Sequence, residues 1–191
     1  MKRFMGLAAL LTVFSLAVGG CVAGGTKVVI LQDMYNPAVD ASNLAAYKGR
    51  TVYFPGVTNQ ANDTTIWSYS SVDKKYYYEA TPSLQTYFWD CFHKAFTRIG
   101  VRVLATPWTP GTEAAKELNV ILNSVTDQKL VFNVTLVVPG EQSFQKQYTV
   151  EAPPTDTADL KELEKRSYKL VDSAFLAMVN DADFRKVFLK K

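Results

Sequence analysis

The alternation that decides the fold lies in Leu130-Val131-Phe132-Asn133-Val134-Thr135-Leu136-Val137-Val138. Apolar side chains occupy every second position of this run, and successive side chains of a strand point to opposite faces. The run therefore predicts a strand with one buried face. The expected buried residues are Leu130, Phe132, Val134, Leu136 and Val138.

Two neighbouring runs, 118–123 and 144–150, show the same alternation. Short turns around Asp127-Gln128 and Pro139-Gly140 separate the three runs, which favours an antiparallel meander. One apolar face and one polar face are typical of an antiparallel sheet that is covered on one side. The two flanking runs are expected to bury Leu118, Val120, Leu122, Phe144, Tyr148 and Val150.

Two amphipathic segments are suited to cover that sheet. Thr81-Pro82 is a helix-start signal, with Thr81 as N-cap, and the helix is expected to end at Gly100, where a left-handed residue is needed. A second helix is expected to begin near Thr157, to end at Asn180-Asp181 and to be followed by a short helix over 183–188. Both long segments repeat apolar residues at helical spacing. Their stripes are Leu84, Tyr87, Phe88, Cys91, Phe92, Ala95, Phe96 and Ile99, and then Leu160, Leu163, Leu170, Val171, Ala174, Phe175, Met178 and Val179.

The first half of the chain predicts further strands. They are expected over 26–32, 51–54 and 101–104, and as a loose hairpin of 66–69 with 75–78, while 59–64 is expected to be a polar loop. Together these elements predict a single α+β domain over 26–191. It is expected to have an antiparallel sheet with a three-strand meander, and two amphipathic helices packed on one face of that sheet.

The N-terminus has the organisation of a secretory signal peptide. Lys2 and Arg3 precede an uncharged apolar run, 4–18, which is shorter than the roughly 20 residues that a membrane-spanning helix needs. Residues 1–20 are therefore interpreted as a cleaved signal peptide. The alternatives are an ordinary signal peptide or an N-terminal anchor helix, each with an incidental cysteine.

The segment Val18-Gly19-Gly20-Cys21 resembles the lipobox of bacterial lipoproteins. In that family a branched apolar residue stands three places before the cysteine, small residues fill the gap, and Val18 and Gly19 are variants of the commoner Leu and Ala or Ser. The resemblance implies cleavage before Cys21, a diacylglycerol and a third acyl chain on that residue, and a tether over 21–25. Several acyl chains give stable anchoring, and Val22 in place of an Asp points to the periplasmic face of the outer membrane.

Charge and composition limit the classes of partner and cofactor that the domain is expected to bind. Loss of Lys2 and Arg3 takes the formal charge from +3 to +1, so the mature domain lacks the basic surface that a nucleic-acid partner requires. With Cys21 assigned to lipid, Cys91 has no cysteine left to pair with. No cofactor or metal motif is found, and no catalytic motif. His93 is expected on the solvated side of its helix and Cys91 in the core, so we expect no enzyme.

Aromatic residues are concentrated in the predicted hairpin. Exposed Tyr and Trp residues are enriched at protein–protein interfaces, so the hairpin is a candidate contact surface for a protein partner or for lipid. The alternative is ordinary packing at the edge of the sheet. The candidate residues are Trp67, Tyr69, Tyr76, Tyr77 and Tyr78.

The order of elements behind the lipobox resembles small envelope lipoproteins of the YajG type and the auxiliary lipoproteins of ABC-type transport systems. This resemblance implies a non-catalytic domain that serves a transport or envelope-assembly complex, with a protein partner in the envelope. A carrier of lipid or another hydrophobic ligand is the alternative, and it predicts an apolar pocket of roughly several hundred Å³ between the helices and the sheet.

Overall fold

The computed structural model describes residues 26–30, 34–61, 66–70, 75–80, 83–104, 106, 116–126, 128–141, 143–155, 157 and 159–190. The elements are β1 (Thr26–Ile30), the 3-10 helix η2 (Ala45–Tyr47), β2 (Thr51–Tyr53), β3 (Val57–Asn59), β4 (Ile66–Ser70), β5 (Lys75–Ala80), α1 (Leu84–Arg98), β6 (Arg102–Leu104), β7 (Lys116–Val125), β8 (Lys129–Val137), β9 (Phe144–Glu151), α2 (Leu160–Val179) and α3 (Ala182–Leu189).

The strands form two sheets. The larger sheet has the order β6-β2-β7-β8-β9, with β3 also pairing with β7, and the smaller has the order β1-β5-β4. The meander β7-β8-β9 is antiparallel, as predicted. The earlier strands differ from the expectation of an antiparallel sheet, because β2 pairs in parallel with β6 and β7, β3 with β7, and β1 with β5. The fold class is α+β, with mixed pairing of the strands.

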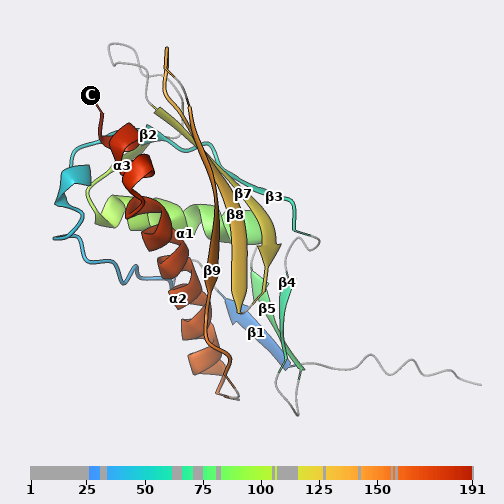
Figure 1. Cartoon of the computed structure of the whole chain (residues 1–191). Coiled ribbons are helices and arrows are strands. Elements are labelled where there is room, and N and C mark those ends of the chain that lie inside the picture. Colours follow the sequence, from blue (N-terminus) through green and yellow to red (C-terminus); the bar gives the residue numbers. More distant parts are fainter. Residues whose placement is uncertain are drawn as a thin grey trace, which may run out of the picture.

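Helices α1, α2 and α3 cover one face of the larger sheet (Figure 1). The ring of Phe132 on β8 contacts Phe92 on α1, with centroids 6.3 Å apart, and Phe92 lies equally close to Phe175 on α2. Phe144 on β9 packs edge-on against Phe184 on α3 at 5.6 Å. These rings fill the space between helices and sheet, and aromatic burial of this kind contributes heavily to core stability. Every residue expected to be buried in the meander is buried.

Both long helices begin later than the sequence suggested. Ser83, and not Thr81, is the N-cap of α1, since its side chain accepts a hydrogen bond from the Thr86 amide. Asp159 caps α2 in the same way, through the amides of Lys161 and Glu162. Side chains with an oxygen close to the backbone satisfy the first free amides of a helix, and several such residues stood next to one another in each start region. The end of α1 is as predicted, because Gly100 adopts φ +82°.

Two details differ from the expectation. Asn59, the first residue of the expected polar loop over 59–64, is the last residue of β3, which pairs with β7 through Val57, Thr58 and Asn59, while residues 62–64 lie outside the described residues. Leu160, expected in the buried stripe of α2, is the first residue of the helix and is 46% exposed, whereas Leu163, one turn later, is fully buried. No helix among the described residues is long and apolar enough to span a membrane.

Candidate functional site

The predicted lipidation site, Cys21, lies outside the described residues. The described chain starts at Thr26, the first residue of β1. In the parallel pairing of β1 with β5, Thr26 is level with Tyr76 and Val28 is level with Tyr78. The segment that follows the lipobox therefore leads into the same sheet that contains the aromatic hairpin.

The register of the hairpin places its aromatic residues on faces of the smaller sheet. In the antiparallel pairing of β4 and β5, Trp67 lies opposite Tyr78 and Tyr69 opposite Tyr76, and residues directly opposite share a face. These four residues therefore share one face, and Tyr77, which lies opposite Ser68, belongs to the other.

Tyr78 is not a surface contact. Its side chain is fully buried in the main core, together with those of Val28, Ile30 and Ala80 from the same face. The expectation that Tyr78 contacts a partner is therefore wrong, because the face it occupies packs against the helices. Tyr77 is the member of the candidate set whose register position lies on the opposite face.

His93 is half-buried rather than solvated. Its ring lies 5.4 Å from that of Trp89, one helical turn earlier in α1. Trp89 in turn donates a hydrogen bond from Nε1 to the carbonyl of Phe54, 3.1 Å away, where the chain passes from β2 to β3. The wide aromatic flank of α1 thus shields the histidine, which the helical wheel alone does not show. Among the described residues, no group of three or more His, Cys, Asp or Glu side chains is placed to hold a metal ion.

Cys91 is a core residue, as expected. Its side chain is fully buried, and burial raises the pKa of the thiol far above its usual value. The thiolate is the reactive form of cysteine, so a raised pKa leaves an inert neutral thiol.

A buried carboxylate on α2 is the main feature that the sequence reasoning missed. The hydroxyl of Tyr35 donates a 2.6 Å hydrogen bond to Oδ1 of Asp172, and the Ala38 amide donates to the same oxygen at 3.3 Å. Asp172 is 8% exposed. Burial raises the pKa of its carboxyl, while the bonds from Tyr35 and Ala38 act in the opposite direction. The signal in the sequence was an acid beside Val171, at the flank of an apolar stripe.

Further hydroxyls join the same helix to its neighbours. Tyr87 on α1 and Ser167 on α2 bring their hydroxyl oxygens to 3.5 Å, and Ser167 donates to the Glu164 carbonyl at 2.6 Å. Tyr47 donates to the Val179 carbonyl at 2.6 Å. Polar groups inside a core need such partners, and these contacts join the segment after β1 to α2, and α1 to α2. We interpret these hydroxyl groups as structural, because each one forms its hydrogen bond or close contact with another group of the domain.

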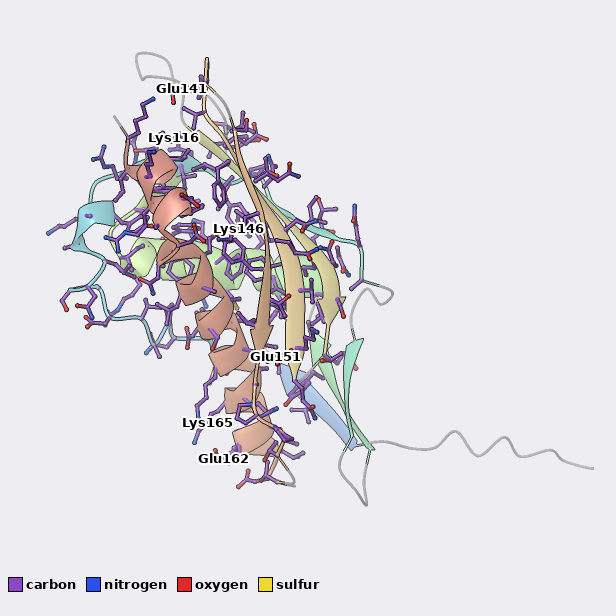
Figure 2. All side chains as sticks on the ribbon, viewed as in Figure 1. Lys116, Glu141, Lys146, Glu151, Glu162 and Lys165 are labelled. Atoms are coloured by element: carbon purple, nitrogen blue, oxygen red, sulfur yellow. The ribbon has the colours of Figure 1, made fainter. Side chains whose placement is uncertain are left out.

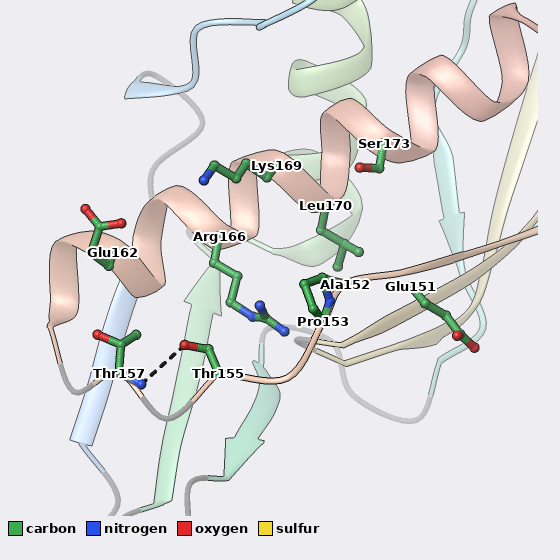
Figure 3. Close-up of a pocket in the computed structure, with 10 residues that line it drawn as sticks. All are labelled: Glu151, Ala152, Pro153, Thr155, Thr157, Glu162, Arg166, Lys169, Leu170 and Ser173. Carbon is green, nitrogen blue, oxygen red and sulfur yellow. Dashed lines mark hydrogen bonds between the residues drawn. The ribbon is translucent and has the colours of Figure 1, made fainter.

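A cavity of about 500 Å³ lies where β9 leads into α2 (Figure 3). Arg166 points toward the connecting segment at Pro153 and Thr155, whereas Lys169 and Glu162 point away from it. The apolar part of the wall comes from Ala152, Pro153 and Leu170. The lining of the cavity comes from Glu151 at the end of β9, from the connecting segment and from α2.

Charged side chains are spread over the molecule in opposite pairs. Figure 2 shows Lys116 and Glu141 at one end, Lys146 in the middle, and Glu151, Glu162 and Lys165 toward the other end. Glu162 pairs with Lys165 at 2.8 Å, Lys190 with Glu141 at 2.7 Å, and Lys146 with Asp181 at 2.5 Å. The distribution agrees with the near-neutral charge of residues 21–191.

These features define a two-layer α+β domain with a tightly partnered interior. No protein-family model and no curated protein matches the chain. Among solved structures, the chain is similar to protein XCC0632 from Xanthomonas campestris, of the DUF330 family, with a TM-score of 0.51 and 9% identity. The match covers 81% of this chain and 92% of the other. At this identity the likeness establishes a shared fold.

Proposed function

We propose that the chain is an envelope lipoprotein, anchored through lipid on Cys21 to the periplasmic face of the outer membrane. In this proposal it is a non-catalytic accessory component of a transport or envelope-assembly complex. The observation that carries it is Val18-Gly19-Gly20-Cys21 at the end of the apolar run, five residues before the folded domain begins at Thr26.

The interior of the domain supports the non-catalytic part of the proposal. Catalysis by a nucleophile requires a base within hydrogen-bond reach and a third group that orients the base. Cys91 is a buried neutral thiol, and the Asp172 carboxyl accepts bonds from Tyr35 and Ala38. His93 lies against Trp89. These groups serve packing and internal hydrogen bonding, which fits a domain that acts by binding.

The transport or assembly role is the finer part of the proposal. It rests on the resemblance to YajG-type lipoproteins and to the auxiliary lipoproteins of ABC-type transport systems. The shared fold with a DUF330 protein concerns the architecture of the domain alone.

The anchoring is tested by producing the chain from residue 1 in a bacterium that processes lipoproteins. Mass spectrometry of the mature protein is expected to show a chain that starts at Cys21 and carries a diacylglycerol group and a third acyl chain on that residue. Cys21→Ala is expected to leave the protein unprocessed and without lipid. Cys91→Ala removes the other thiol of the chain and is the matched control, which must keep the lipid. An unmodified sulfur at position 21 in the parent protein contradicts the proposal.

The accessory role is tested by crosslinking in intact cells. The lipidated protein is expected to give defined crosslinked species with an envelope protein, and these should depend on membrane anchoring. Only random crosslinks, equal in number for the parent protein and the Cys21→Ala variant, would count against a stable complex.

A carrier of lipid or another hydrophobic ligand is the second candidate, favoured by the cavity beside α2. Its volume of about 500 Å³ is within the range of small-molecule sites, and Leu170 contributes apolar surface. Native mass spectrometry of the purified protein should then show a bound lipid. Ser173→Trp, which fills the cavity from its exposed side, should displace that lipid, whereas the exposed Ser143→Trp should not.

A further inference from the structure

We propose that one end of the smaller sheet rests on the bilayer surface. This anchor end consists of Thr26 of β1, Tyr69 and Ser70 of β4, and Lys75 and Tyr76 of β5, and its occupant is the lipid headgroup layer. The inference rests on the proposed anchoring at Cys21 and adds to it which surface of the domain faces the membrane.

The length of chain before the domain is the first argument. Five peptide steps separate Cys21 from Thr26, and a fully extended chain gains at most about 3.6 Å per residue. Thr26 therefore lies within about 18 Å of the acylated residue, whatever path the chain takes. This reach is less than the thickness of one bilayer and limits how far the start of β1 can stand from the headgroups.

The register of the sheet is the second argument. Tyr76 pairs with Thr26 on one side and with Tyr69 on the other, while Ser70 pairs with Lys75 at the turn end of the hairpin. The pairing of β1, β4 and β5 thus brings these residues to the same end of the sheet as Thr26, the residue through which the domain connects to Cys21. In Figure 1 this end of β1, β4 and β5 lies at the bottom of the molecule.

The chemistry of the anchor end fits a bilayer surface. Tyrosine is enriched at membrane–water interfaces, since its ring is apolar and its hydroxyl seeks water. Tyr69 and Tyr76 form a directly opposed pair at this level. By register Lys75, opposite Ser70, and Lys27, opposite Tyr77, belong to the other face of the same strand ends, and lysine residues are attracted to anionic headgroups. Aromatic and cationic residues together favour lipid over a protein partner at this end.

The domain holds the anchor end in a fixed orientation. Val28, Ile30 and Tyr78 of the smaller sheet are buried in the core that also contains α1 and α2. The sheet cannot turn independently of the helices without exposing those side chains. A membrane contact at the anchor end therefore orients the whole domain and points the turn between β8 and β9 away from the bilayer. Glu141, in that turn, lies at the top of Figure 2.

Two matched serine variants test the inference in the full lipidated protein. Ser70→Cys lies in the anchor end, and Ser143→Cys lies after the β8–β9 turn, where it is exposed. Each is labelled with a thiol-reactive fluorophore, with the parent protein as control for labelling at the buried Cys91. The proteins are reconstituted into vesicles of phosphatidylcholine and phosphatidylglycerol that contain a headgroup nitroxide lipid.

The label at position 70 is expected to be quenched at least about twofold more than the label at position 143, which lies beyond the roughly 5–8 Å headgroup layer. Thr58→Cys, exposed on β3 in the other sheet, provides a second comparison site and should be quenched less than position 70. Equal quenching at positions 70 and 143, or stronger quenching at 143, overturns the inference.

Mass spectrometry and vesicle flotation separate this result from the proposed function. A protein that carries lipid on Cys21 and floats with vesicles, but shows equal quenching, keeps its anchor and loses the proposed orientation. A parent protein without lipid on Cys21 overturns both statements.

Discussion

The hydrogen bond between Tyr35 and Asp172 gives the sharpest stability prediction. Tyr35→Phe removes the donor of a 2.6 Å bond to a carboxylate, and both residues are buried. A hydrogen bond to a charged group contributes roughly 1.5–3 kcal/mol. We therefore expect the free energy of unfolding at pH 7 to fall by about 2 kcal/mol. For a domain of this size, that loss lowers Tm by roughly 4–8 °C.

The effect of Tyr35→Phe should depend on pH in a defined direction. Burial raises the pKa of Asp172 in the folded state above its unfolded value of about 3.9. The carboxyl therefore destabilises the fold as pH rises through that interval, and the Tyr35 bond offsets part of this cost. The loss caused by Tyr35→Phe should be greatest near pH 7 and should shrink as the pH falls and the Asp172 carboxyl takes up its proton.

Two controls isolate the bond. Asp172→Asn keeps an oxygen acceptor without the charge, so Tyr35→Phe in that background should cost only about 1 kcal/mol. Tyr168→Phe removes a hydroxyl that bonds Glu164 on the same helix, at a half-buried site, and should cost less than Tyr35→Phe. Chemical denaturation at pH 4 and pH 7 measures the parent protein, the three single variants and the Tyr35→Phe/Asp172→Asn double variant. A cost of Tyr35→Phe that is independent of both pH and the Asp172→Asn background refutes the reasoning.

Two further predictions concern the backbone and the thiol. Chemical denaturation should show that Gly100→Ala destabilises the protein more than Gly140→Ala. Both glycines have positive φ, and the backbone strain that an alanine would add at either position is about 1–2 kcal/mol, but only at Gly100 would the new Cβ lie 3.0 Å from Lys48 Cγ. Equal losses of stability would contradict the steric part of this reasoning. Cys91 should resist a thiol reagent in the folded protein and react at the rate of unfolding, since burial raises the pKa of its thiol; fast labelling under native conditions would show that the site opens locally.

Periodicity predicted the elements whose burial is regular. Each of the alternate residues from Leu130 to Leu136 in β8 is buried, as is Val138 just after it, and the stripe of α1 is buried throughout. These patterns arise from a local geometric repeat, so one sequence contains them in full. Helix starts were less certain because Thr81 and Ser83 both have capping side chains, and only packing decides which one is used.

The pairing of distant strands was beyond the sequence pattern. β3 has three residues and pairs with β7 more than fifty positions later, so its stability comes from a neighbour and not from its own sequence. The candidate site shows the same limit. Alternation correctly separated Tyr77 from Tyr76 and Tyr78, but the burial of Tyr78 depends on how the smaller sheet packs against the helices. The carboxylate of Asp172 likewise required knowledge of Tyr35, 137 positions earlier.

The tyrosine hydroxyls explain how a domain without an internal disulfide orders the irregular segment after β1. Between Tyr35 and Tyr47 this segment has only one short 3-10 helix, yet both of these side chains are buried and donate to α2 or its final carbonyl. Loss of either bond would free the connection between the smaller sheet and the larger one. If the anchor end rests on a bilayer, the same bonds transmit its orientation to the helices. Tyr35→Phe should then reduce the difference in quenching between labels at positions 70 and 143 while the protein is still folded.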